Sequence, residues 1–194
     1  MSACLTMRAQ YSVSPGYAQW WDDDHAYVMR RTVACTDDYQ DLWNGCYVRS
    51  INGYVYIYDS GRNRILYGDK VWLFASGYYC VRRNGYEYLY NPDGSRTGVY
   101  GNDIREYPWN SYAVEKNGNW YIYDADGSRL SFYSDQQPHL FWNGCWEFSH
   151  NGTWYVADAD GDRVSGIYGD EIYLMNNGQW KCIRNGNVYI RGGN

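Results

Sequence analysis

The sequence predicts an all-β protein made of about five repeats of short antiparallel strands, each about 33 residues long. The composition of 24 Tyr, 10 Trp and 21 Gly favours pleated strands joined by tight turns, and no long window of helix-forming residues interrupts it. Short aromatic runs alternate with Asn-Gly and Asp-Gly pairs, which accept the positive φ angles of hairpin turns. One of these turns recurs at spacings of 32, 33, 34 and 34 residues, with its Asn at Asn52, Asn84, Asn117, Asn151 and Asn185.

Four short strands are expected in each repeat, and residues 143–163 (NGCWEFSHNGTWYVADADGDR) contain the clearest copy of the pattern. The first strand lies between two Asn-Gly turns (CWEFSH), and the second follows the second turn (TWYVAD). The third follows the Asp-Gly turn (DRVSGI), and the fourth is brief (EIYLM). Both faces of the first two strands are aromatic or aliphatic, so we expect neighbouring units to cover both faces.

The chain is expected to form a single repeat domain over residues 1–194. Its predicted parts are an N-terminal closing segment (1–17), a degenerate first unit (18–51), regular units (52–83, 84–116, 117–150 and 151–184) and a closing strand (185–194). Terminal units of repeat proteins are often atypical because one of their faces has no neighbour.

Two arrangements of the units, a closed ring and an open row, are consistent with the repeats. We expect a small five-bladed β-propeller, because the sequence stops half-way through a unit, after NVYIR, and N-terminal residues could complete that blade. The alternative is an open solenoid of β-hairpins, which the short repeat favours, since propeller repeats usually have about 40–45 residues.

Charge and hydropathy argue against several functional classes for this chain. The net charge of −5 and the pI near 5.1 argue against a nucleic-acid binder with a basic stripe. No run of about 18 apolar residues predicts a membrane span. Because the first 17 residues contain no apolar signal core, we expect a cytoplasmic protein.

The six cysteines are interpreted as packing residues. They form no Cys-x-x-Cys pair, and the three His are scattered, so no zinc site is predicted. Cys46 and Cys145 occupy the same position of the repeat, directly after an Asn-Gly turn, which indicates small apolar packing residues. Disulfides are the less favoured alternative, because we expect a reducing compartment.

The segment NGTWYVADADGDRVSGIYGDEIYLMNNGQWKCIRNG resembles the repeats of the bacterial WG-repeat family, over roughly residues 44–190. Departures are Tyr121 and Tyr155 in place of the family's glycine after Trp, and Val55, Glu87 and Val188 in place of the Trp. NGNWYIYDADGS and NGYEYLYNPDGSRTG are also similar to choline-binding and glucan-binding repeats, which have a shorter period. Both resemblances imply a binding or scaffold role without enzymatic activity.

Candidate catalytic and metal-binding residues are few. Asp124–Ser128 and Asp158–Asp162 look like fragments of calcium loops, but the glycine at 158–162 comes one residue early, so we expect structural turns and no metal or cofactor. We interpret Asp22–Asp24 as a solvated loop. Ser149 and His150 are neighbours in a predicted strand and point to opposite faces, so we predict no catalytic residues and no enzyme.

The recurring aromatic and basic residues are the candidate binding residues. Tyr side chains at one repeat position and Arg side chains after the Asp-Gly turns would form an aromatic surface with a rim of cations. The candidates are Trp20, Trp21, Tyr56, Tyr88, Tyr121, Tyr155, Arg62, Arg96, Arg129 and Arg163. The alternatives are core packing for the Tyr and pairing with the adjacent Asp for the Arg. Segments that differ between units, 20–25 and 136–139, are further candidates.

These observations together predict a non-catalytic module for protein–protein binding, such as an adaptor or an inhibitor that docks on a larger complex. A lectin-like, glycan-binding protein is the alternative. Nucleic acids and membranes are not expected partners.

Overall fold

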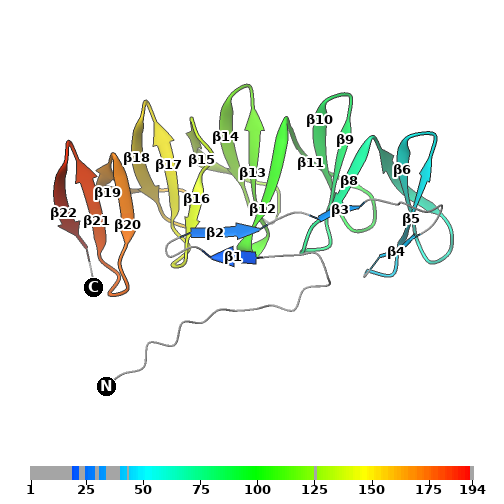
Figure 1. Cartoon of the computed structure of the whole chain (residues 1–194), viewed down its shortest axis with the longest axis horizontal. Coiled ribbons are helices and arrows are strands. Elements are labelled where there is room, and N and C mark those ends of the chain that lie inside the picture. Colours follow the sequence, from blue (N-terminus) through cyan, green and yellow to red (C-terminus); the bar gives the residue numbers. More distant parts are fainter. Residues whose placement is uncertain are drawn as a thin grey trace, which may run out of the picture.

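The protein is all-β, as predicted, and its strands form five antiparallel sheets arranged in a row (Figure 1). The computed structural model describes residues 19–21, 25–28, 31–33, 40–42, 44–124 and 126–192, and for residues 19–33 it describes the strands alone. The sheets at the two ends of the row, β4–β7 and β20–β22, lie at opposite ends of the long axis. This arrangement is the open row of the solenoid alternative, and it does not show the ring closure of a propeller. No helix in the described residues is long and apolar enough to cross a membrane.

Each sheet has three or four strands from one continuous stretch of chain. Sheet 1 contains β4 (Gln40–Asp41), β5 (Tyr47–Ile51), β6 (Tyr54–Tyr58) and β7 (Arg64–Gly68). Sheet 2 contains β8 (Lys70–Leu73), β9 (Tyr79–Arg83), β10 (Tyr86–Tyr90) and β11 (Arg96–Gly101). Sheet 3 contains β12 (Asp103–Tyr107), β13 (Ser111–Lys116), β14 (Asn119–Tyr123) and β15 (Arg129–Ser134), with a 3-10 turn at Pro108–Asn110. Sheet 4 contains β16 (His139–Phe141), β17 (Trp146–His150), β18 (Thr153–Ala157) and β19 (Arg163–Gly169). Sheet 5 contains β20 (Glu171–Leu174), β21 (Trp180–Arg184) and β22 (Asn187–Arg191).

The Asn-Gly pairs form the hairpin turns that the sequence predicts. The five Asn have φ between 48° and 54°, and the Gly that follow them have φ between 75° and 84°. Positive φ at both central residues is the geometry of a two-residue turn whose twist matches that of paired strands. The four strands expected in residues 143–174 are present as β17, β18, β19 and β20.

Successive sheets stack, so both faces of an inner sheet are covered. Val48, Ile57 and Leu66 of sheet 1 pack against Tyr79 and Val81 of sheet 2, and all five are nearly inaccessible to solvent. Equivalent clusters join sheets 2 and 3, sheets 3 and 4, and sheets 4 and 5. This stacking explains why the strands are apolar on both faces.

Three N-terminal strands extend sheets that lie far along the chain. β2 (His25–Val28) pairs with β16 of sheet 4 and with β1 (Gln19–Trp21), and β3 (Arg31–Val33) pairs with β8 of sheet 2. The predicted first unit (18–51) therefore contributes strands to sheets 4, 2 and 1. The other edges of sheets 2 and 4 are β11 and β19, so the N-terminal strands lie along one side of the row, and no described strand pairs with these opposite edges (Figure 1).

Where the chain passes from one sheet to the next, a glycine packs closely against the backbone of a strand in the following sheet. A methyl group at Gly101 would lie 2.4 Å from the carbonyl oxygen of Glu115, and one at Gly169 would lie equally close to that of Ile183. The equivalent residue in sheet 3 is Ser134, which is fully buried and whose Oγ accepts a hydrogen bond from the Ser149 N–H at 2.9 Å.

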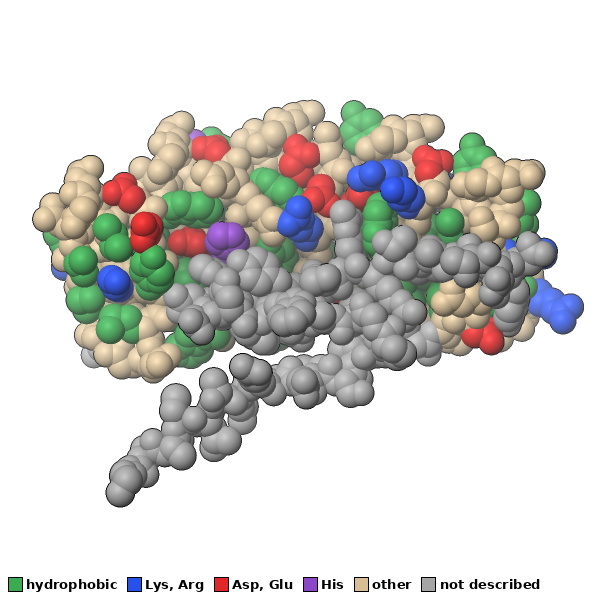
Figure 2. Space-filling model, viewed as in Figure 1, with side chains coloured by type: hydrophobic (Ala, Val, Ile, Leu, Met, Phe, Trp, Pro, Cys, Tyr) green, Lys and Arg blue, Asp and Glu red, His purple; other side chains and the backbone are tan. Residues whose placement is uncertain are grey.

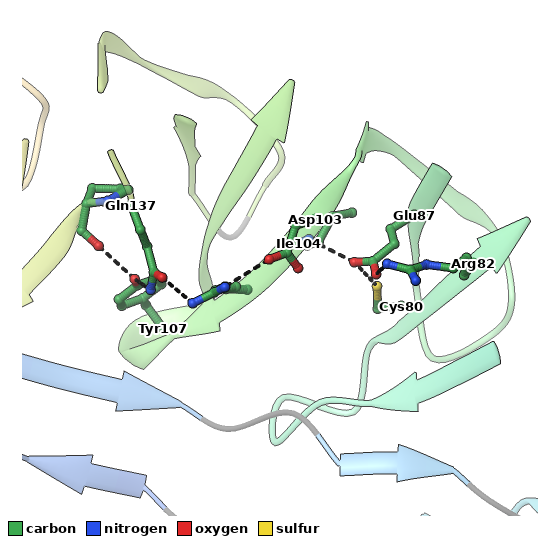
Figure 3. Close-up of polar contacts among 9 residues, drawn as sticks. Cys80, Arg82, Glu87, Asp103, Ile104, Tyr107 and Gln137 are labelled. Carbon is green, nitrogen blue, oxygen red and sulfur yellow. Dashed lines mark hydrogen bonds and ion pairs between the residues drawn. The ribbon is translucent and has the colours of Figure 1, made fainter. Parts of the chain in front are cut away.

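Glu87 links sheets 2 and 3 from inside the stack (Figure 3). Its carboxylate is fully buried and accepts hydrogen bonds from Arg82 Nη2 at 2.8 Å, from the Ile104 N–H at 2.8 Å and from the Cys80 thiol at 3.4 Å. Arg82 and Cys80 belong to the same sheet as Glu87, whereas Ile104 lies on β12, the first strand of the next one. The carboxylate therefore joins two sheets at a position where other units have Trp or Val.

A second polar link joins sheets 3 and 4. Arg105 donates to Asp103 at 3.0 Å and to the side chain of Gln137 (Figure 3). Gln137 Nε2 donates to the Tyr107 hydroxyl at 2.8 Å, and this hydroxyl donates to the carbonyl of Pro138 at 2.7 Å. The predicted variable segment 136–139 is thus held by contacts within the protein.

Glu106 closes the turn between β8 and β9. Its buried carboxylate accepts hydrogen bonds from the backbone N–H groups of Ala75 at 2.7 Å and Ser76 at 3.0 Å. Burial raises the pKa of Glu106 above its ordinary value of 4.5, although the hydrogen bonds from Ser76 and Ala75 oppose this shift.

The raised pKa of Glu106 predicts a measurable dependence of stability on pH. Because the folded state holds this proton more tightly than the unfolded state, the stabilisation is complete below pH 4.5 and is lost as the pH rises through the raised pKa. We expect the free energy of unfolding of the wild type, relative to that of Glu106→Gln, to fall over this range. Urea unfolding of both proteins across the acidic range measures the difference, and a difference that is constant with pH would contradict the prediction.

Candidate functional site: a ladder of tyrosines and cations

Four pairs of tyrosines recur at the same place on sheets 1 to 4. In each pair the two residues lie directly opposite each other on the last two strands of the sheet, so their side chains emerge on the same face. The ring centroids lie 5.6, 6.0, 6.3 and 6.1 Å apart in Tyr56–Tyr67, Tyr88–Tyr100, Tyr121–Tyr133 and Tyr155–Tyr168, respectively.

An arginine from the start of the last strand lies over one ring of each pair. The distances from the guanidinium carbon to the ring centroid are 5.4 Å for Arg64, 5.1 Å for Arg96, 5.2 Å for Arg129 and 3.8 Å for Arg163. These arginines share one repeat position, just after the turn that joins the last two strands. Cation–π attraction to the ring restricts each side chain.

The following sheet supplies a second basic side chain to each pair. Its source is the residue that ends a strand just before the Asn-Gly turn. Arg83 lies 4.2 Å from the Tyr67 ring, Lys116 Nζ lies 4.4 Å from the Tyr100 ring, and Arg184 lies 3.4 Å from the Tyr168 ring. His150 meets the Tyr133 ring edge to face at 5.2 Å.

Two of these second cations are also fixed by hydrogen bonds. Arg83 Nε and Arg184 Nε each donate at 2.7 Å to the backbone carbonyl of the tyrosine beneath, Tyr67 and Tyr168.

We call two paired tyrosines with their two basic residues a rung, and the four rungs the ladder. Each rung therefore spans two sheets.

The ladder follows the side of the row opposite to the N-terminal strands. Its outer tyrosines are on β7, β11, β15 and β19, which are edge strands of their sheets. These rings are partly exposed, at 38% for Tyr67, 49% for Tyr100, 41% for Tyr133 and 37% for Tyr168. Figure 2 shows the side on which β2 and β3 lie, where acidic and basic side chains are mixed with hydrophobic ones.

Cations are concentrated in the ladder although the protein is acidic. Seven of the 17 Lys and Arg belong to it: Arg64, Arg83, Arg96, Lys116, Arg129, Arg163 and Arg184. Across residues 40–42, 44–124 and 126–192, none of the seven is in an ion pair with a carboxylate. The geometry therefore favours ring contacts over the pairing of arginine with the adjacent Asp.

Carboxylates interrupt this row of cations at regular places. Asp69, Asp135 and Asp170 each come two residues after an outer tyrosine. They accept hydrogen bonds from the first N–H of the next Asn-Gly turn, at 3.2, 2.6 and 2.7 Å. Asp135 also lies 3.8 Å from His150 Nδ1. Asn102 holds the equivalent position after Tyr100, so a carboxylate accompanies three of the four rungs.

Seven of the ten predicted binding residues lie in the ladder. They are Tyr56, Tyr88, Tyr121, Tyr155, Arg96, Arg129 and Arg163. Sequence reasoning did not identify the outer tyrosines or the basic residues of the following sheet, although both recur at constant repeat positions. Such a recurrence is the signal that could have identified them.

Arg62 does not belong to the ladder, and Arg64 holds the equivalent position. Arg62 has φ of 67°, and its backbone N–H donates to the Asp59 carbonyl. Gly94, Gly127 and Gly161 make the equivalent hydrogen bond, each within its own turn. It therefore occupies the glycine position of the turn. Trp20 and Trp21 lie in β1 at the other side of the row, and their side chains are outside the described part of the chain.

The Asp-rich turns use their carboxylates internally. Asp158 Oδ1 accepts from the Asp162 N–H at 2.8 Å, and Asp124 Oδ1 accepts from the Ser128 N–H at 2.9 Å. Burial raises the pKa of Asp124, with a contribution from its neighbour Asp126. The described residues contain no group of three or more potential ligands placed to hold a metal ion. Asp22–Asp24 lie outside the described residues.

The described cysteines are free thiols that pack against the core. Cys46 lies against the cluster between sheets 1 and 2, and Cys145 against the cluster between sheets 4 and 5. Burial raises the pKa of the Cys145 thiol, which makes the reactive thiolate scarcer.

Comparisons with known proteins show no family for this chain. A scan against models of protein families found no match, and a search of curated proteins found none. Among solved structures, the TCP10 domain of CPAP from Danio rerio in complex with a STIL peptide is 12% identical, with 79% of this chain and 73% of that chain covered and a TM-score of 0.18. The wild-type TCP10 domain of Danio rerio CPAP is 11% identical, with 92% of this chain and 91% of that chain covered and a TM-score of 0.21. At these TM-scores the likenesses carry no argument, and the resemblance to WG repeats stays a prediction.

Proposed function

We propose that this chain is a non-catalytic protein-binding module, such as an adaptor, that docks on a partner protein through the ladder. The observation that carries the proposal is the fourfold recurrence of one arrangement, two tyrosines with two basic residues, along an edge with which no strand of the described residues pairs. Tyr and Arg are the residues enriched at the centres of protein interfaces. Hydrogen bonds and ring contacts already restrict these side chains, which lowers the entropy cost of ordering them on binding.

The ring contacts favour a protein partner over the glycan alternative. A sugar ring packs on an open aromatic face. In rungs 1, 2 and 4 a cation lies between 3.4 and 4.4 Å from an outer tyrosine ring and occupies one of its faces. Tyrosine hydroxyls and guanidinium N–H groups, which a polypeptide can pair with, are the groups left for recognition.

The environment of Ser149 supports the non-catalytic part of the proposal. Its side chain is fully buried, and its Oγ accepts a hydrogen bond from the Gln136 N–H at 3.1 Å. His150 points to the other side of the strand, toward Tyr133. The pair therefore does not form a nucleophile and base.

Removal of four ladder cations tests this function. We expect Arg64→Gln, Arg96→Gln, Arg129→Gln and Arg163→Gln, combined in one variant, to abolish stoichiometric co-purification of a protein partner that the wild type retains. The matched control removes four cations outside the ladder, as Arg62→Gln, Lys70→Gln, Lys181→Gln and Arg191→Gln. The partner, identified by mass spectrometry and purified, is then titrated against all three proteins. Equal binding by the ladder variant and the wild type would refute the proposal.

A further inference from the structure

The first arginine of three rungs has unused hydrogen-bonding capacity. Within the described residues, the side chains of Arg64, Arg129 and Arg163 donate no hydrogen bond, although each lies over a tyrosine ring. A guanidinium has five N–H donors in a planar fork that fits a carboxylate. These three side chains are thus exposed and positioned, with their N–H groups free of protein acceptors in the described residues, and they suit an anionic ligand.

The spacing of the rungs defines the length of ligand that can reach them. Stacked sheets lie about 10 Å apart, and a polypeptide in the extended polyproline II conformation advances about 3.1 Å per residue with about three residues per turn, so every third side chain points the same way. The interval between neighbouring rungs therefore corresponds to about three residues of extended chain. A segment that crosses all four rungs spans three such intervals, which corresponds to about ten residues.

The carboxylates of this edge favour a peptide over a nucleic acid. Asp69, Asp135 and Asp170 each bond the residue that follows a second basic residue of the ladder, and the protein carries a net charge of −5. A nucleic-acid strand has a phosphate at every nucleotide and would meet these carboxylates. A peptide can place acidic residues opposite the cations and neutral residues opposite the carboxylates.

We infer that the ladder binds an acidic segment of a protein partner in the extended polyproline II conformation, with Asp or Glu at every third position, along the direction of the row. This inference rests on the proposed function and adds the chemistry of the partner to it. In this arrangement the acidic side chains pair with the first arginines of the rungs, and the outer tyrosine hydroxyls face the peptide between them.

Fluorescence anisotropy with labelled peptides of about ten residues tests the inference on the full chain. One peptide carries Glu at every third position, and a second has the same composition with its Glu side by side. We expect the spaced peptide to bind about fivefold or more tightly than the second, and its binding to weaken with added salt. Equal affinities, or no binding of either peptide, would overturn the inference.

A matched pair of variants tests the position of the contact. Arg64→Gln should weaken binding of the spaced peptide about three- to fivefold, the effect of one exposed charge pair. Arg62→Gln removes the same charge two residues away, at the turn, and should change the affinity less than twofold. Similar losses in both variants would overturn the assignment of Arg64.

Single-stranded DNA of matched length separates failure of this inference from failure of the proposed function. We expect it to bind more weakly than the spaced peptide. Tighter binding of DNA, abolished by the fourfold ladder variant, would overturn both the acidic-peptide inference and the protein-binding function. If neither peptide binds but the ladder variant still loses its purified protein partner, the inference is wrong and the proposed function stands.

Discussion

Replacement of Glu87 by alanine should lower the free energy of unfolding by about 3 kcal/mol, the lower end of the cost of removing one partner from a buried charged pair, because the Arg82 side chain is 36% exposed. The substitution leaves the Ile104 N–H without its acceptor between two sheets and the Arg82 guanidinium without its carboxylate. Burial of unpaired polar groups of this kind is costly because water cannot replace the lost bonds. Urea unfolding followed by tryptophan fluorescence measures the loss.

Two further substitutions at this position separate charge from size. Glu87→Gln keeps an oxygen for the Ile104 N–H and loses only the ion pair, so we expect a loss of about 1–2 kcal/mol. Glu87→Val, which copies the residue of the first and last repeats, should cost nearly as much as alanine because it also lacks an acceptor. Full stability of Glu87→Val would show that the carboxylate does not join the sheets.

The second large effect is expected at the passage between sheets 2 and 3. Gly101→Ala should lower the free energy of unfolding by about 3 kcal/mol or more, since overpacking against backbone typically costs 1–3 kcal/mol and occasionally more. The new methyl group would lie 2.4 Å from the Glu115 carbonyl oxygen and 2.5 Å from a methyl group of Val114, and neither strand can withdraw without breaking the stack. Thermal unfolding monitored by circular dichroism measures the change.

Gly98→Ala is the matched control for Gly101→Ala. Gly98 is on the same strand with φ of 87° and has open space where its methyl group would lie. This substitution should cost only the strain of a positive φ, about 1–2 kcal/mol. Equal losses at the two positions would show that the close approach at Gly101 is relieved without cost. Because stacked repeats depend on their neighbours, unfolding of Gly101→Ala in two separate steps is a further expected sign.

The strands and turns were largely predictable because they depend on neighbours in the chain. The Asn-Gly turns require positive φ at two successive residues, and few residue pairs accept it. The alternation of Trp120 and Ile122 with Tyr121 and Tyr123 predicted two covered faces, and in the structure Trp120 and Ile122 pack toward sheet 4 whereas Tyr123 packs toward sheet 2. The mode of closure was not predictable, because the same hairpins can stack in a ring or in a row.

The ladder was predictable in part. The inner tyrosines and three of the four arginines follow from their constant repeat position. Both Arg62 and Arg64 follow the first Asp-Gly-like turn, Asp59-Ser60-Gly61, whose glycine is shifted by one residue, and the prediction assigned the site to Arg62. Only the backbone shows that Arg62 takes the φ of the turn glycine and that Arg64 reaches Tyr67.

By itself the sequence determined the repeat length, the turn types and the strands of this protein, since these are set by local backbone preferences and by side-chain alternation. Tertiary structure alone decided which residues from different repeats meet. Arg83 and Arg184 reach tyrosines on the preceding sheet, and β2 and β3 add to sheets that begin tens of residues later. These contacts depend on how the sheets stack and twist, and a periodic sequence reads the same for every such stacking. The edge left uncovered by the N-terminal strands, and with it the candidate site, is therefore a property of the folded chain.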